Sequence, residues 1–144
     1  MSRKVARELS FKLIFALNFQ AEELNLEDMI DDLLMKSENA ADIVKEDVSY
    51  INDVVSGVFS RVEELDKLIE ANLKGWKMER ICKTDLAILR LAIYEILYRK
   101  DIPNKVSANE AVELAKMFSE DGSSSFVNGL LAGIIKNNVE ETNE

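Results

Sequence analysis

The sequence contains no histidine, and it has only one cysteine and one proline. Because histidine is missing, the chain cannot build a Ser-His-Asp or Cys-His catalytic site, nor a histidine-ligated metal centre. Cys82 has no partner for an internal disulfide, which suits the reducing cytoplasm. The five glycines match neither a dinucleotide-binding fingerprint nor a P-loop. We therefore expect a protein that is not an enzyme, without catalytic, cofactor-binding or metal-binding residues.

Long apolar runs are missing as well. None approaches the ~20 residues that a membrane-spanning helix needs. The N-terminus has no apolar core of a signal peptide, because Arg7, Glu8 and Lys12 interrupt it. With 47% hydrophobic and 31% charged residues among 144, the composition is that of a folded globular protein. These features predict one domain, residues 1–144, in the cytoplasm.

Apolar residues at helical spacing are what the chain does contain, and they define three predicted helices in its C-terminal half. The first covers residues 85–97, and its stripe is Leu86, Leu89, Ile93, Ile96 and Leu97. The next begins at Ser107 and carries Ala111, Val112, Ala115 and Phe118 on one side. The third follows the break at residues 122–125 and shows Phe126, Val127, Leu130, Leu131, Ile134 and Ile135.

Local signals predict where these helices begin and end. Thr84 is a good N-cap, and Asp85 places negative charge on the first turn, where the helix dipole favours it. Pro103 ends any continuation, because it lacks an amide donor and disfavours helical geometry in the residue before it. Ser107 followed by Glu110 forms a predicted capping box at the start of the next helix.

The N-terminal half also predicts three helices. The first covers about residues 2–20, and the second begins at Asn25. A long third helix covers about residues 45–72, and Gly75 prevents it from continuing. Gly57 lies inside that helix, where it either bends it or lets a neighbouring helix approach closely.

The sequence therefore predicts an all-α fold, a compact bundle of six to seven helices. We expect two three-helix subdomains, about residues 1–74 and 75–138, followed by a loose tail over residues 139–144. The period is helical throughout, and no sustained alternating run of the kind typical of strands occurs.

The net charge of −9 argues against broad, non-specific binding of nucleic acid, but the charge is uneven. Residues 22–70 contain fifteen acidic side chains against four basic ones, whereas residues 74–105 contain eight basic side chains against four acidic ones. Residues 1–12 are also basic. If the two basic segments meet in the fold, a modest basic patch results.

The first predicted helix has two apolar faces. Its core stripe is Ala6, Leu9, Leu13, Ala16 and Leu17, and the opposite face carries Lys4, Arg7, Phe11, Ile14 and Phe15, with Arg3 at its margin. Cations followed by rings on one face suit a strand of RNA, whose phosphates and unstacked bases they could contact. Alternatively, the rings pack on other helices and the cations are only solvated.

Four stretches carry a resemblance to a known family. They are residues 89–95 (Leu-Arg-Leu-Ala-Ile-Tyr-Glu), 101–103 (Asp-Ile-Pro), 109–116 (Asn-Glu-Ala-Val-Glu-Leu-Ala-Lys) and 126–129 (Phe-Val-Asn-Gly). In this order they resemble the NusB family of bacterial transcription antitermination factors. A weaker likeness reaches Ala6-Arg7-Glu8, so the resemblance covers nearly the whole chain.

The resemblance implies a fold and a function. NusB-like proteins are all-helical and bind the boxA element of nascent RNA as a heterodimer with NusE, a ribosomal small-subunit protein. The complex joins other Nus factors on RNA polymerase and suppresses premature termination, above all in ribosomal RNA operons. By position, the implied RNA-binding residues are Arg3, Lys4, Arg7, Phe15, Ser123, Ser124 and Phe126, and the implied contact to NusE is Asp85.

Three departures from the family pattern affect these assignments. Val5 and Ala6 interrupt the N-terminal cations, Ser125 stands where the family often has a basic residue, and Ala132 replaces an acidic or amide residue. The first two make dependence on NusE for RNA binding more important. Two other hypotheses remain: a helical protein–protein adaptor without intrinsic RNA binding, and a homodimer formed through Phe11 and Phe15.

Overall fold

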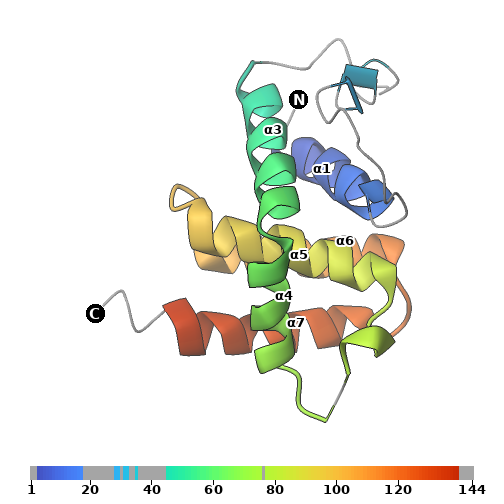
Figure 1. Ribbon diagram of the computed structural model, residues 1–144, viewed down its shortest axis with the longest axis vertical. Coiled ribbons are helices and arrows are strands. Elements are labelled where there is room, and N and C mark those ends of the chain that lie inside the picture. Colours follow the sequence, from blue (N-terminus) through green and yellow to red (C-terminus); the bar gives the residue numbers. More distant parts are fainter. Residues whose placement is uncertain are drawn as a thin grey trace.

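The computed structural model describes residues 3–17, 28–29, 31–32, 35, 45–75 and 77–139, and within them it is helical, without strands (Figure 1). The α-helices are α1 (Arg3–Leu17), α3 (Lys45–Ser60), α4 (Val62–Ala71), α5 (Lys83–Tyr98), α6 (Asn104–Phe118) and α7 (Ser123–Ile134). A 3-10 turn, η2 (Met78–Arg80), precedes α5, and a π-helical turn, η3 (Ile135–Val139), continues α7. The predicted all-α fold is confirmed. None of the helices in this part of the chain is long and apolar enough to cross a membrane.

Helix α5 is the central element of the fold. Its residues are apolar on nearly every side, and those from Asp85 to Ile96 are buried except Arg90. A helix that is hydrophobic all round must be covered on all sides, and α1, α3, α4, α6 and α7 all contact α5. Figure 1 shows α5 crossing the middle of the molecule among these helices.

The other helices pack around α5 into one core. Helix α1 contacts α3 and α5, and α6 packs between α5 and α7. Arg90 joins α5 to α4, because its guanidinium donates to both carboxylate oxygens of Asp66 at 2.9 and 2.8 Å. The core therefore includes apolar side chains from every α-helix of the described ranges.

The predicted long helix over residues 45–72 is wrong, because the chain bends at Arg61 and forms two helices. Ser60 donates from its hydroxyl to the carbonyl oxygen of Gly57, at 3.3 Å, and Gly/Ser pairs are common sites of sharp bends. Gly57 itself serves close packing: a Cβ atom there would lie 2.2 Å from the ring of Tyr94 on α5. The second interpretation of Gly57, a close approach of a neighbouring helix, is thus confirmed.

Two predicted helix starts are also wrong. Helix α5 begins at Lys83, so Thr84 lies inside its first turn and does not cap it. Helix α6 begins directly after Pro103, whose carbonyl accepts the amides of Val106 and Ser107. Ser107 is therefore helical, and its hydroxyl donates to Glu95 of α5, which rules out the predicted capping box.

Some predictions lie outside the described residues. These are the start of the first helix at Ser2, its last turn up to Gln20, most of the helix beginning at Asn25, and the tail after Val139.

The contact of Gly57 with Tyr94 predicts a specific loss of stability. Gly57→Ala should lower the free energy of unfolding by about 1–3 kcal/mol, because the new methyl group overlaps the ring and α3 must move away from α5. Urea denaturation followed by circular dichroism measures the change.

Gly129→Ala is the matched control, since an added Cβ at this helical position meets nothing within 4 Å. It should leave stability unchanged or raise it by up to about 1 kcal/mol through helix propensity. Equal effects of the two substitutions would contradict the packing role of Gly57.

Candidate nucleic-acid interface

The start of α1 is fixed by one buried carboxylate, that of Glu95 on α5, whose residue is 0% exposed. Arg7 of α1 donates to it from Nε at 2.7 Å and from Nη2 at 3.0 Å. The hydroxyl of Tyr50 on α3 donates to the same carboxylate, and so does the Oγ of Ser107 on α6, at 2.8 Å. These four residues, here called the Glu95 cluster, connect α1, α3, α5 and α6.

The Glu95 cluster satisfies the buried charges that it contains. Burial lowers the pKa of the Arg7 guanidinium, but its hydrogen bonds with Glu95 and the attraction of that carboxylate outweigh this and raise the pKa. Burial, followed by the negative charge of Glu95, raises the pKa of the Tyr50 hydroxyl well above its ordinary value. Both groups therefore stay protonated near neutral pH and keep donating to the carboxylate.

Arg7 does not face outward toward RNA as the resemblance implies, because it is 4% exposed and committed to Glu95. The reason is that α1 is covered on both of its apolar faces. Phe11 and Ile14, on the face of Arg7, are buried like Ala6, Leu9 and Leu13 of the core stripe on the other side. A signal for this pairing is present in the sequence: Glu95 is the only charged residue in the apolar run 91–97, where a carboxylate needs a cationic or hydrogen-bonding partner.

Arg3 and Lys4 remain at the surface, where Lys4 is exposed and Arg3 is half-buried. The guanidinium carbon of Arg3 lies 4.5 Å from the centroid of the Tyr50 ring. That of Arg99, at the end of α5, lies 5.5 Å from the same ring. The two basic segments of the sequence therefore meet at Tyr50, although Asp53 and Asp101 each accept a hydrogen bond from Arg99 at 3.0 Å and reduce the local positive charge.

The aromatic residues of α1 are mostly covered. Phe11 is 4% exposed, and its ring lies 6.3 Å from that of Phe15 and 5.3 Å from that of Phe118 on α6. Phe15 is half-buried against the core. A homodimer built on exposed Phe11 and Phe15 does not fit this arrangement, because Phe11 is already buried within the chain.

Asp85, in the first turn of α5, and Ser123, at the start of α7, are hydrogen-bonded to each other. Asp85 is 6% exposed, and its carboxylate accepts hydrogen bonds from the Oγ of Ser119 at 2.6 Å and from that of Ser123 at 2.9 Å. This second buried cluster fixes the turn between α6 and α7, residues 119–122, onto the start of α5. The predicted roles of Asp85 as a direct contact to NusE and of Ser123 as a direct contact to RNA do not fit this burial. Ser124 and Phe126, beside them, are half-buried.

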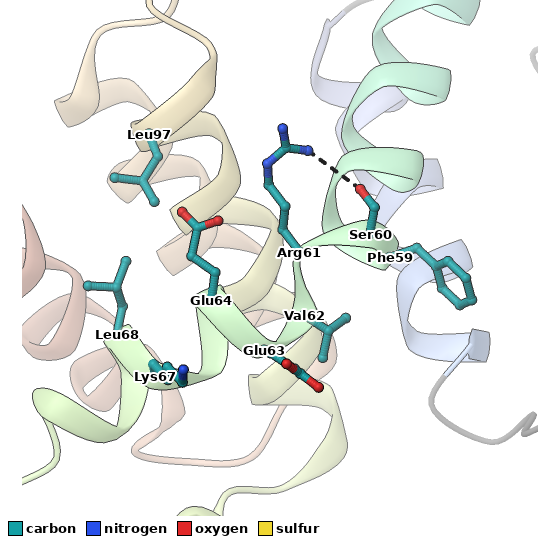
Figure 2. Close-up of a pocket in the computed structure, with 9 residues that line it drawn as sticks. All are labelled: Phe59, Ser60, Arg61, Val62, Glu63, Glu64, Lys67, Leu68 and Leu97. Carbon is teal, nitrogen blue, oxygen red and sulfur yellow. Dashed lines mark hydrogen bonds between the residues drawn. The ribbon is translucent and has the colours of Figure 1, made fainter.

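A groove of about 920 Å³ lies elsewhere, between the end of α3, α4 and the end of α5. Figure 2 shows Glu64 next to the helix that carries Leu97 and the guanidinium of Arg61 turned toward Ser60, while Phe59 points away from both. Arg61 and Glu64 both contact Tyr98. The guanidinium carbon of Arg61 lies 4.5 Å from the centroid of the Tyr98 ring, and the Tyr98 hydroxyl donates to Glu64 at 2.5 Å. We assign no site to this groove.

Comparison with known proteins gives matches along nearly the whole chain. The sequence model of the NusB family matches residues 4–136. The transcription antitermination protein NusB of Acetivibrio thermocellus is 48% identical over 136 residues, covering 94% of this chain and 90% of that protein. The protein of the same name from Clostridium novyi is 44% identical over 138 residues, covering 94% and 99%.

Solved structures give the same result. NusB from T. maritima has a TM-score of 0.85 at 31% identity, and the match covers 100% of this chain and 99% of that one. A crystal structure of the antitermination factors NusB and NusE in complex with dsRNA contains a chain with a TM-score of 0.79 at 25% identity, covering 93% and 96%.

The Glu95 cluster predicts a large cost for removing its charge. Glu95→Gln removes the carboxylate that is hydrogen-bonded to the buried Arg7 guanidinium and leaves only the more distant Glu110, at 4.0 Å, so the free energy of unfolding should fall by about 3–5 kcal/mol. The double variant Arg7→Met/Glu95→Gln should recover part of this loss, because no unpaired charge stays buried. Chemical denaturation of the three proteins measures both effects.

Glu8→Gln is the control, because Glu8 pairs with Lys12 at 3.3 Å on the surface of the same helix. Exposed pairs contribute little, and stability should change by less than about 1 kcal/mol. A loss as large as that of Glu95→Gln would show that the burial of the Arg7 pair is not what matters.

Proposed function

The chain belongs to the NusB family, and on this premise we propose that it is a transcription antitermination factor that binds boxA RNA together with NusE. The observation that carries the proposal is the match, over 93% of this chain, to a structure in which NusB and NusE are bound to RNA. In this proposal the heterodimer joins other Nus factors on RNA polymerase in the bacterial cytoplasm and suppresses premature termination in ribosomal RNA operons.

The proposed RNA surface follows the exposed side of α1. Lys4 and the guanidinium of Arg3 contact phosphates, and the Tyr50 ring under Arg3 holds that guanidinium near the helix start. Phe15 offers part of its ring to a base, while Ser124 and Phe126 extend the surface along the start of α7.

In this proposal the buried residues Arg7, Ser123 and Asp85 do not contact the RNA or NusE directly, but position the residues that do. Arg7 fixes the rotation of α1 about its axis and so determines which residues face the RNA. Asp85 and Ser123 hold the turn between α6 and α7, and NusE contacts the exposed side of this region. Dependence on NusE agrees with the net charge of −9, which leaves the chain alone with a weak attraction for RNA.

The proposed role is one of binding and not of catalysis. Within the described residues, no cluster of three or more carboxylates or thiols could hold a metal ion, and the sequence has no histidine. The net negative charge favours a second candidate, an adaptor that binds proteins but not RNA. Measurement of RNA binding separates the two.

The cations of α1 predict a salt-dependent affinity. With NusE present, Arg3→Ala/Lys4→Ala should weaken binding of a boxA-type RNA by about tenfold near physiological salt. It should also reduce the slope of log affinity against log salt by about 0.7 for each phosphate of a single strand that the variant no longer neutralises. Fluorescence anisotropy at several salt concentrations gives both values.

Lys67→Ala/Lys77→Ala removes the same charge from exposed positions on α4 and before η2, and should change neither value. Equal losses in the two double variants would mean that only net charge matters. If the folded wild-type chain binds no RNA with NusE present, the antitermination proposal is wrong and the adaptor is favoured.

A further inference from the structure

Phe118 is an aromatic side chain that packs against the core on one side and is exposed on the other. It is the last residue of α6, and it is 37% exposed. One side of its ring lies against Phe11, with 5.3 Å between centroids and an angle of 35° between planes. Because Phe11 is 4% exposed and part of the core, the half-exposed ring rests on a rigid support.

A cation lies over this ring. The ammonium group of Lys12 lies 5.5 Å from the centroid of Phe118, and the Lys12 side chain is 46% exposed. Lys12 pairs with Glu8 of the same helix at 3.3 Å, at the surface. Such an exposed pair is weak, so Lys12 can readily leave Glu8 for another anion. Sites for single-stranded nucleic acid combine these two elements, a ring on which a base stacks and a cation that reaches the phosphate next to it.

Phe118 also lies between the two parts of the proposed RNA surface. On one side, Phe11 connects it to Phe15 of α1, 6.3 Å from Phe11. On the other side, the chain continues from Phe118 through the turn at residues 119–122 to Ser123 and Ser124 of α7. In Figure 1 the end of α6, drawn in orange, lies next to the end of α1, drawn in blue.

We propose that Phe118 and Lys12 form a subsite for one base of the RNA, here called the aromatic platform. An unstacked base lies on the Phe118 ring, and Lys12 contacts the adjacent phosphate. The inference rests on the proposed RNA binding and deepens it, because it gives the RNA a continuous path from α1 to the turn before α7. The platform reads a π-face and not a hydrogen-bond pattern, so it contributes affinity with little base preference.

A protein partner is the other class of occupant for an exposed apolar group. Met117, the neighbour of Phe118, is 58% exposed and would suit such a contact. The Phe118 ring, however, packs on an aromatic ring and has a cation over it at 5.5 Å, and a ring with a nearby cation is what a stacking site for nucleic acid combines. We therefore assign the ring to RNA and make the protein contact an outcome of the test.

The test is binding of a fluorescent boxA-type single-stranded RNA to the full chain with NusE present. Phe118→Leu keeps an apolar contact on Phe11 but removes the aromatic face, and should weaken binding by about tenfold or more. Phe118→Tyr keeps the face and should bind like the wild type. Met117→Ala is the matched control on the neighbouring exposed position and should bind unchanged.

Salt dependence separates the ring from the cation. Phe118→Leu should leave the slope of log affinity against log salt as it is, whereas Lys12→Ala should reduce it by about 0.7. Circular dichroism and thermal unfolding check that each variant is folded at the assay temperature, and Phe118→Tyr keeps the question answerable if Phe118→Leu is unstable.

Three outcomes would overturn the inference. Wild-type affinity of a folded Phe118→Leu, in a protein whose Arg3→Ala/Lys4→Ala variant binds weakly, would remove the platform and leave the proposed function intact. A loss of NusE affinity by Phe118→Leu without RNA, large enough to explain the RNA result, would assign the ring to the protein partner. Absence of RNA binding by the wild type would remove both the platform and the proposed function.

Discussion

The ion pair between Arg7 and Glu95 is the interaction on which the arrangement of the helices depends. A carboxylate in the most deeply buried helix is costly unless every oxygen is satisfied, and here a bidentate guanidinium, a phenol and a hydroxyl supply the donors. Because the donors come from α1, α3 and α6, only one mutual placement of these helices with α5 satisfies the charge. Apolar packing alone would tolerate small rotations of α1, whereas a bidentate pair does not.

A second buried carboxylate, Asp85, has the same role at the opposite end of α5. Through Ser119 and Ser123 it fixes the start of α7, while Glu95 fixes the start of α1. The exposed residues proposed for RNA binding flank these two clusters. In the proposal, the buried polar residues thus position the RNA surface, and the cationic and aromatic side chains at that surface contact the RNA.

The all-helical fold could be predicted from the sequence because the apolar period is helical in every segment, and the family resemblance rests on an ordered set of motifs in α5, α6 and α7. The burial of Arg7 could not be predicted from α1 alone. That helix has apolar residues on two faces, and periodicity cannot tell which face meets α3 and α5 and which meets α6.

The predicted capping role of Ser107 is wrong for a related reason: its partner, Glu95, is distant in the chain, whereas the capping rule considers only near neighbours. The Gly57/Ser60 pair marks a place where a helix can bend, but whether it bends at Arg61 depends on how α4 covers α5, which is a property of the tertiary structure.

The central claim is that α1, fixed from inside by Glu95, presents one continuous RNA surface that reaches the end of α6. The most direct measurement is the mapping of amide chemical-shift changes by NMR when a boxA-type RNA is added to the isotope-labelled chain in complex with unlabelled NusE. The account predicts that the changes concentrate at the exposed positions of α1, at the end of α6 and at the start of α7. Changes concentrated instead around the groove of Phe59 and Leu68, with α1 unaffected, would contradict it.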